Sequence, residues 1–274
     1  MDTPASHVAA PSLLRVNGYD MAYVAAGAGR PLLLVHGSLC DCRYWRPQMA
    51  PLAAGRHVIA LSLRHYWPEA WDGSGAGFSV QQHADDVAAF IAALDAGPVD
   101  LVGHSRGGTV AWMLAWQRPA LLRSLVLADP ALALGEAQMD LDRGGFRRRA
   151  LALIRGGDAD AGLALFIDTV SGAGTWEHMV PGLRRMMRDN ANTLIGQAVE
   201  PAETVSTAAA QSLRLPLLLV GGAHSPAPYP AILQALAALL PGAEHATIPG
   251  ASHAMNLWNA PAFNRALESF LPAA

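Results

Sequence analysis

Short apolar runs alternate along the chain with longer stretches in which apolar residues recur every three or four positions. The runs predict strands, and the longer stretches predict helices. The predicted strands cover residues 13–16, 21–24, 31–35, 57–63, 99–102, 124–128, 215–220 and 246–248. The predicted helices cover residues 81–94, 109–116, 232–240 and 263–271. Strands that alternate with helices indicate the α/β class, with a mostly parallel eight-stranded sheet flanked by helices.

Two local features refine this architecture. Asn17-Gly18 separates the first two predicted strands, and this dipeptide favours the tight turn of a β-hairpin. Residues 132–212 interrupt the alternation, because they contain no convincing strand. Helical spacing recurs there at 143–154, 161–170, 181–188 and 190–199. We therefore expect an all-helical cap domain, 132–212, inserted after the sixth strand over the carboxyl edge of the sheet, and a core domain formed by 1–131 and 213–274.

The composition excludes some classes of function. Hydrophobic residues make up 52% of the 274 residues, and 22 acidic residues face 19 basic ones. A nucleic-acid-binding protein usually has a basic excess, and a disordered chain has low hydrophobicity and high net charge. The apolar runs fall far short of the roughly 20 residues of a membrane helix. Residues 1–11 lack the pattern of a secretion signal. We expect a cytoplasmic protein without nucleic-acid or membrane partners.

The two cysteines, Cys40 and Cys42, stand one residue apart. A disulfide across such a short span would be strained, so we expect two free thiols in a reducing compartment. No cysteine cluster of the zinc type is present. We expect neither a metal site nor a cofactor.

The segment Gly103-His104-Ser105-Arg106-Gly107 matches the G-x-S-x-G pattern. By itself the pattern is weak, but here the serine follows a predicted strand and precedes a predicted helix. That setting is the one in which a sharp turn exposes a nucleophilic hydroxyl. The glycines have a mechanical role, since larger side chains would collide in such a turn. The alternative is a serine that caps a helix in a glycine-rich turn.

Two further segments complete a resemblance: His36-Gly37 after the third strand, and Gly250-Ala251-Ser252-His253 after the last one. With the serine turn, they make the chain resemble α/β-hydrolases that have a helical cap, over residues 13–271. The resemblance implies Ser105 as the nucleophile. The dehalogenase and epoxide-hydrolase branches use aspartate at this position, which argues against those activities.

His253 is the candidate general base. A serine hydroxyl needs a base to take its proton, and an imidazole titrates near working pH. In the family that it resembles, the base follows the last strand, where His253 stands. We expect His104 to be structural and His36 to brace the neighbouring loop, while His224 and His245 have no assigned role.

The orienting acid departs from the commonest family pattern. It usually follows the seventh strand, but residues 221–227 contain no carboxylate. The family's other position for the acid is just after the sixth strand, where Asp129 stands. Strand ends at the same sheet edge converge, so Asp129 is expected to reach His253 Nδ1 and hold its tautomer. Alternatively, Asp129 caps the first turn of the cap with the help of Pro130.

The resemblance also implies an oxyanion hole, in which two backbone N–H groups meet the charge of the tetrahedral intermediate. They belong to Arg106, after the nucleophile, and to Ser38, in the loop after the third strand. The candidate substrate contacts are His36, Leu39, Trp67, Trp176 and Met255.

Two questions about the surroundings stay open. The aromatic loop 62–71 either walls the substrate pocket or packs under the cap. The cap residues Phe166, Trp176, Met179, Met186 and Met187 form either an apolar roof or ordinary core. Likewise, the arginines at 147–149 and 184–185 are solvated, or one of them binds an anionic substrate group.

We predict a serine hydrolase that cleaves a carboxylic ester or lactone of a small, mainly apolar substrate through an acyl-enzyme intermediate. Two alternatives remain: hydrolysis of a carbon–carbon bond in a ring-fission product, and a small-molecule receptor that keeps the fold without turnover. The sequence does not indicate an oligomeric state.

Overall fold

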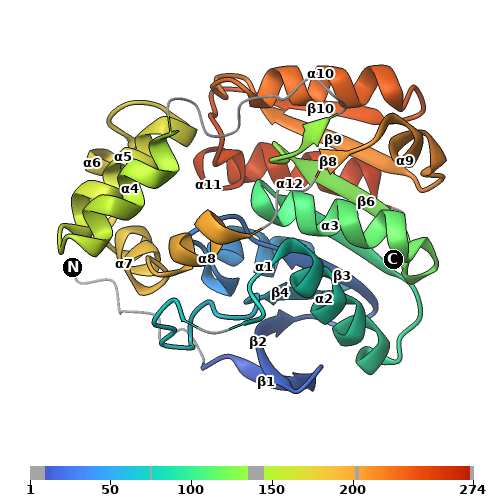
Figure 1. The fold of residues 1–274 in the computed structure, drawn as a ribbon. Coiled ribbons are helices and arrows are strands. Elements are labelled where there is room, and N and C mark those ends of the chain that lie inside the picture. Colours follow the sequence, from blue (N-terminus) through green and yellow to red (C-terminus); the bar gives the residue numbers. More distant parts are fainter. Residues whose placement is uncertain (1–9, 75, 135–144, 201–203, 272–274) are drawn as a thin grey trace, which may run out of the picture.

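The computed structural model describes residues 10–74, 76–134, 145–200 and 204–271. Eight strands form one sheet in the order β1-β2-β4-β3-β5-β6-β9-β10 (Figure 1). The strand β2 pairs in antiparallel fashion with both of its neighbours, β1 and β4. All the other neighbouring strands of this sheet pair in parallel. This confirms the predicted mostly parallel sheet. The strands are β1 (Ser12–Val16), β2 (Tyr19–Ala26), β3 (Arg30–Val35), β4 (Arg56–Leu61), β5 (Val99–His104), β6 (Leu122–Ala128), β9 (Leu217–Gly222) and β10 (Glu244–Ile248).

The predicted hairpin joins β1 to β2. Its two turn residues, Asn17 and Gly18, have φ values of 48° and 74°. Positive φ at both central residues is the requirement of the turn that matches the twist of the flanking strands, and Asn-Gly meets it at low cost.

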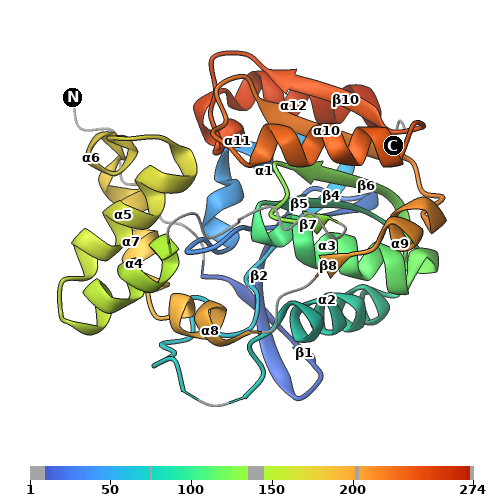
Figure 2. The ribbon, with the colours of Figure 1, turned by 45° about the horizontal axis from the view of Figure 1, so that its top comes forward.

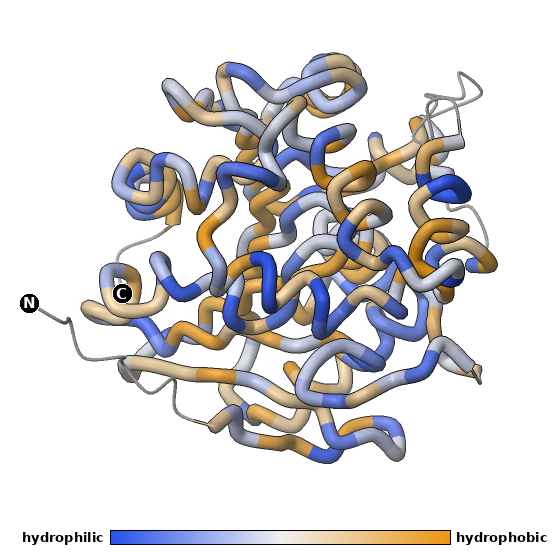
Figure 3. The backbone as a smooth tube through the Cα atoms, turned by 90° about the vertical axis from the view of Figure 1, so that its left-hand side faces the viewer, coloured by the Kyte–Doolittle hydropathy of each residue, from blue (hydrophilic) through white to orange (hydrophobic). Residues whose placement is uncertain are grey.

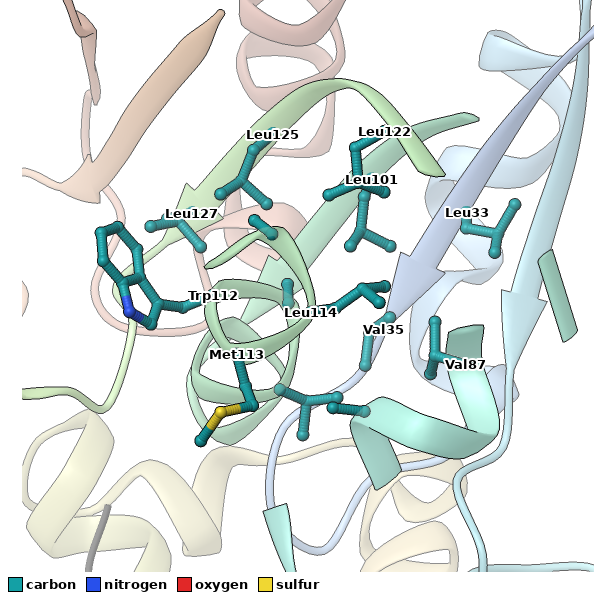
Figure 4. Packing of buried hydrophobic residues seen from close by; sticks show 14 of the residues in the cluster. Leu33, Val35, Val87, Leu101, Trp112, Met113, Leu114, Leu122, Leu125 and Leu127 are labelled. Atoms are coloured by element: carbon teal, nitrogen blue, oxygen red, sulfur yellow. The ribbon is translucent and has the colours of Figure 1, made fainter. Parts of the chain in front are cut away.

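The sheet is covered on both faces, and the alternation of side chains along each strand explains how. Leu33 and Val35 point into one hydrophobic cluster, whereas Leu32 and Leu34 point into the other. Figure 4 shows the first cluster, where residues of the sheet meet helical residues such as Trp112 and Val87. The first face packs on α2 (Val80–Leu94), α3 (Arg106–Gln117) and α10 (Tyr229–Leu239), and the second on α1 (Arg46–Leu52) and α12 (Ala260–Phe270).

Short helices escaped the sequence analysis. They include α1, a 3-10 helix η1 (Cys42–Trp45), α9 (Thr207–Ser212) and α11 (Met255–Trp258). None spans enough turns to show a period, and Pro47 and Pro51 further disguise α1. The helix α3 begins at Arg106, directly after the serine of the elbow, because Gly107 and Gly108 continue the helix despite their low propensity.

The segment after β6 is mostly helical, as predicted, but it also contains two short strands, and its last helix packs on the core. It contains α4 (Phe146–Arg155), α5 (Ala159–Ser171), α6 (Thr175–His178), α7 (Pro181–Asp189) and α8 (Thr193–Val199). Two strands that we did not expect, β7 (Ala133–Leu134) and β8 (Thr204–Val205), pair in parallel. Two residues are too few for a periodic pattern. The helix α9, which we placed in the cap, contacts α3 and α10 of the core.

Figures 1 and 2 show α4, α5, α6 and α7 grouped to one side of the sheet. Hydrogen bonds tie this segment to loops at the carboxyl ends of strands. In two of them, Ser38 Oγ donates to Gln197 Oε1 (2.8 Å), and Ser252 Oγ donates to the carbonyl of Ser171 (2.7 Å). Residues 143–144, the start of the first predicted cap helix, lie outside the described residues, as do residues 1–9.

Hydrophobic and hydrophilic positions alternate over short distances along the backbone (Figure 3). Within the described ranges, every helix is too short or too polar to cross a bilayer.

Candidate active site

Ser105 occupies a strained turn between β5 and α3. Its φ and ψ values are 53° and −120°, a conformation that non-glycine residues seldom adopt. The turn fits because its neighbours lack side chains: a Cβ on Gly107 would lie 2.4 Å from the carbonyl oxygens of Val35 and His36. The elbow therefore presses against the end of β3. Ser105 itself is 7% exposed.

The predicted base and acid meet. His253 Nδ1 lies 3.2 Å from Asp129 Oδ2, although 124 residues separate them in sequence. Asp129 follows β6 directly, and its backbone N–H donates to the carbonyl of Val220 in β9 (2.9 Å). His253 stands in the loop between β10 and α11. Both side chains are buried.

Ser225, which the sequence analysis did not single out, completes this pair. It lies in the loop after β9, and its Oγ donates to Asp129 Oδ2 at 2.5 Å. The same carboxylate oxygen thus accepts from both Ser225 and His253. Only one feature of the sequence hinted at this role of Ser225. Residues 221–227 contain no carboxylate, so a hydroxyl in that loop can come close to Asp129.

Two aromatic side chains fix the position of His253. The ring of Tyr229, at the start of α10, stacks on the imidazole with 3.8 Å between centroids and 14° between planes. His104 Nε2 lies 2.8 Å from the carbonyl oxygen of His253, so this nitrogen is the donor. We expected His104 to be structural. It directly precedes Ser105, so this hydrogen bond joins the serine turn to the backbone of His253.

No hydrogen bond joins the described side chains of Ser105 and His253. The rings of His104 and His253 lie 4.7 Å apart, which brings His253 beside the elbow. Among the described residues, the Ser105 hydroxyl has no hydrogen-bond partner. Catalytic hydrogen bonds of this kind are often long or misaligned until substrate binds.

Burial dominates the titration of the pair. It lowers the pKa of His253 to about 3, so the imidazole is neutral and free to accept a proton at neutral pH. Burial also raises the pKa of Asp129 to about 7, and the hydrogen bond from Ser225 offsets part of that rise. The carboxylate form of Asp129 therefore prevails only above neutral pH.

The predicted oxyanion donors flank the nucleophile. Arg106 is the first residue of α3, where backbone N–H groups have no partner within the helix. The loop that carries Ser38 also lies against the elbow, since a Cβ on Gly37 would be 3.0 Å from Ser105 Cβ.

His36 is not available to a substrate, which corrects its place among the candidate contacts. It is fully buried. Its Nε2 accepts from the Leu63 N–H group (3.1 Å), and its Nδ1 donates to the Gly37 carbonyl (2.8 Å). Burial lowers the pKa of His36 to about 4, in keeping with a neutral ring that braces the loop.

The other candidate contacts are mostly covered. Leu39 and Met255 are fully buried in the second hydrophobic cluster. Trp67 is half-buried, with the guanidinium of Arg43 4.0 Å above its ring, and Trp176 is nearly buried. The structure therefore does not gather them on one open surface.

The side chain of Arg106 has a partner that the sequence did not reveal. Its Nη2 donates to Glu200 Oε2 (2.5 Å), and its Nη1 donates to His83 Nδ1 (2.9 Å). Glu200 follows α8, so this ion pair links the helical segment to the elbow. A pair 94 residues apart leaves no local pattern.

In the part of the chain that the structure describes, no group of three or more His, Cys, Asp or Glu side chains is arranged to hold a metal ion. Cys40 and Cys42 are buried free thiols.

Comparisons with known proteins agree with this fold. A family model described as the alpha/beta hydrolase family matches residues 32–266. A soluble epoxide hydrolase from Corynebacterium sp. strain C12 is 35% identical over 114 residues, which are 42% of this chain and 39% of that protein. The chain spans less than half the length of the first curated relatives that it matches.

Two solved structures share the fold over nearly the whole chain. The carboxylesterase CesB from Bacillus subtilis superposes with a TM-score of 0.80 at 18% identity, covering 96% of this chain and 92% of that one. The enol-lactonase from Burkholderia xenovorans LB400 gives 0.77 at 22% identity, covering 94% and 98%.

Proposed function

Because the chain belongs to the alpha/beta hydrolase family, we propose that it is a serine hydrolase that cleaves a carboxylic ester or lactone. The substrate is small and mainly apolar, and the reaction passes through an acyl-enzyme intermediate without a cofactor. The observation that carries the proposal is the hydrogen bond between His253 and Asp129 beside the elbow of Ser105.

Each residue has a defined step. Ser105 Oγ attacks the substrate carbonyl carbon while His253 Nε2 takes the hydroxyl proton. Asp129, hydrogen-bonded to Nδ1, stabilises the imidazolium. The N–H groups of Arg106 and Ser38 bind the oxygen that becomes negative. The tetrahedral intermediate then expels the alkoxide, which takes the proton from His253. A water molecule, deprotonated by His253, attacks the acyl carbonyl carbon and forms a second tetrahedral intermediate. This intermediate breaks its bond to Ser105 Oγ, which takes the proton back from His253, and the carboxylic acid leaves.

The known proteins support the choice of bond. The two structural neighbours are described as a carboxylesterase and an enol-lactonase. The epoxide hydrolase is a less suitable guide, because residue 105 of this chain is serine, whereas that branch of the family uses aspartate as nucleophile.

Labelling tests the nucleophile. A fluorophosphonate probe should modify the wild-type protein at residue 105, and Ser105→Ala should abolish the labelling. Ser212→Ala, which removes a hydroxyl on α9 far along the chain, is the matched control and should label like wild type. Labelling that survives Ser105→Ala would refute the assignment.

Substrates then separate the three functions. Turnover of p-nitrophenyl esters and simple lactones near the usual 10 s⁻¹ or so supports the proposal. Turnover of a vinylogous diketone acid alone supports carbon–carbon hydrolysis. Turnover below about 1 s⁻¹ on every substrate, with tight ligand binding, supports a receptor.

A further inference from the structure

A cavity of about 580 Å³ lies between the helical segment and the core. Residues of α5, α6 and α7 line one side, and residues of η1, α1 and α11 line the other. Figures 1 and 2 show α11 on the side of the sheet that faces α5 and α6. Its walls are largely apolar, with Ile167, Met179, Leu183, Met187 and Leu257 among them. Ligand pockets in proteins usually measure about 300–1,000 Å³ and have such walls.

This cavity is separate from the proposed catalytic residues. Neither Ser105, His253 nor Asp129 lines it. Tyr44 contacts both regions: the residue lines the cavity, and its ring stacks on His104 with 5.2 Å between centroids. A ligand in the cavity would therefore contact Tyr44, whose ring stacks on the residue before Ser105.

The charged groups that line the cavity are all basic. Arg43, Arg46 and Arg185 contribute to the lining, and no described carboxylate does. Asp41 and Asp189 neutralise Arg43 through ion pairs of 2.7 and 2.9 Å. Arg185 is exposed and forms no ion pair with a described residue. The cavity thus offers a cation without a partner beside an apolar interior.

The lining also includes large apolar side chains that face water. Val180 is 60% exposed, and Trp258 is 54% exposed. Exposed apolar side chains grouped at a concavity mark a surface that a ligand covers. An apolar interior, exposed apolar lining residues and the guanidinium of Arg185, which pairs with no described carboxylate, match a molecule with a hydrocarbon chain and one anionic end.

We propose that this cavity is a second ligand site, which binds a straight-chain carboxylate with its chain among Met179, Leu183 and Met187 and its carboxylate on Arg185. The guanidinium suits a carboxylate because it offers two parallel N–H donors. The site does not depend on hydrolysis at Ser105.

Isothermal titration calorimetry with octanoate, decanoate and dodecanoate, below their micellar concentrations, tests the site. The full chain carrying Ser105→Ala and the wild type should bind alike, with one molecule per chain. Each two-carbon extension should lower Kd about tenfold until the chain fills the cavity, and decanol should bind about tenfold more weakly than decanoate.

Two variants of α7 locate the charge. Arg185→Gln should weaken decanoate about tenfold. Arg184→Gln removes the neighbouring arginine, which does not line the cavity, and should leave Kd unchanged. Trp258→Ala should also weaken binding of decanoate. Equal effects of the two arginine variants, equal affinity for decanol, or no saturable binding would overturn the proposal.

The probe labelling of Ser105 distinguishes this failure from failure of the proposed function. A protein that labels at Ser105 but does not bind decanoate refutes only the second site. One that binds decanoate but does not label refutes only the hydrolase.

Discussion

Ser225 and Asp129 are joined by a hydrogen bond of 2.5 Å, and its acceptor is the carboxylate oxygen that also faces His253 Nδ1. Hydrogen bonds to an ionised acceptor are shorter and stronger than neutral ones. The loop after β9 therefore contributes a hydroxyl that favours the charged form of the acid that follows β6. In the proposed mechanism, Ser225 is a positioning residue, since it would act through Asp129.

Replacement of Ser225 by alanine should change the pH dependence of kcat/KM. Burial raises the pKa of Asp129 to about 7, and the carboxylate is present above that pH. Activity should therefore rise with pH through about 7 in the wild type. Loss of the Ser225 hydrogen bond raises the pKa of Asp129 further, so the acid limb should shift to higher pH. At pH 7, kcat/KM should fall about tenfold.

A pH–rate profile of Ser225→Ala with an ester whose leaving group does not titrate measures this shift. Ser225→Thr keeps a hydroxyl and should restore the wild-type limb. A uniform loss of rate at all pH values, with the limb unmoved, would reduce Ser225 to a packing role.

Asp129→Asn should lower kcat by about four orders of magnitude, because the amide no longer stabilises the imidazolium and favours the wrong tautomer. The side chain keeps its volume, so the protein should remain folded. Steady-state kinetics and a thermal melt by circular dichroism together check this expectation. Asp72→Asn, on the surface loop 71–74, is the control. Near wild-type turnover of Asp129→Asn would mean that the acid lies elsewhere.

The sequence predicted the sheet because buried parallel strands leave runs of apolar residues, such as Leu32 to Val35, that need no partner to be recognised. It also predicted that Asp129 would meet His253, since parallel strands bring their carboxyl ends to one edge. Both predictions need only the path of the backbone, not the orientation of individual side chains.

The remaining site residues depend on where individual side chains point. Ser225 and Tyr229 stand in an irregular loop and the first turn of a helix, and neither belongs to a periodic pattern. Glu200 meets Arg106 only after the whole helical segment folds back. Similarly, His36 belongs to a recognisable motif, but the motif does not show that both of its ring nitrogens form hydrogen bonds with backbone groups.

Tyr229 should affect catalysis through the orientation of the imidazole. Its ring lies parallel to that of His253 at 3.8 Å, so it limits rotation of the base. Tyr229→Leu should lower kcat about three- to tenfold, the range expected for loss of a stacked aromatic pair, with little change in KM. Tyr229→Phe retains a ring and should keep most of kcat. If both variants behave alike in stopped-flow and steady-state assays, stacking is not the cause.

The ion pair between Arg106 and Glu200 should stabilise the elbow and the helical segment together. The side chains of this pair are 6% and 15% exposed, so Glu200→Gln leaves a nearly buried guanidinium without its counter-charge. Such a loss costs about 3 kcal/mol in the free energy of unfolding, which lowers Tm by roughly 6–12 °C in a chain of this size.

Asp160→Asn breaks the pair with Arg188 and provides the matched control. The side chains of Arg188 and Asp160 are 46% and 53% exposed, so water screens their attraction and loss of the pair should leave the free energy of unfolding nearly unchanged. The two variants also differ in what they touch, because Arg106 supplies a proposed oxyanion donor through its backbone. Glu200→Gln should therefore lower kcat as well as Tm, whereas Asp160→Asn should change neither by much. A Glu200→Gln protein that melts like wild type would show that water or another side chain replaces the carboxylate.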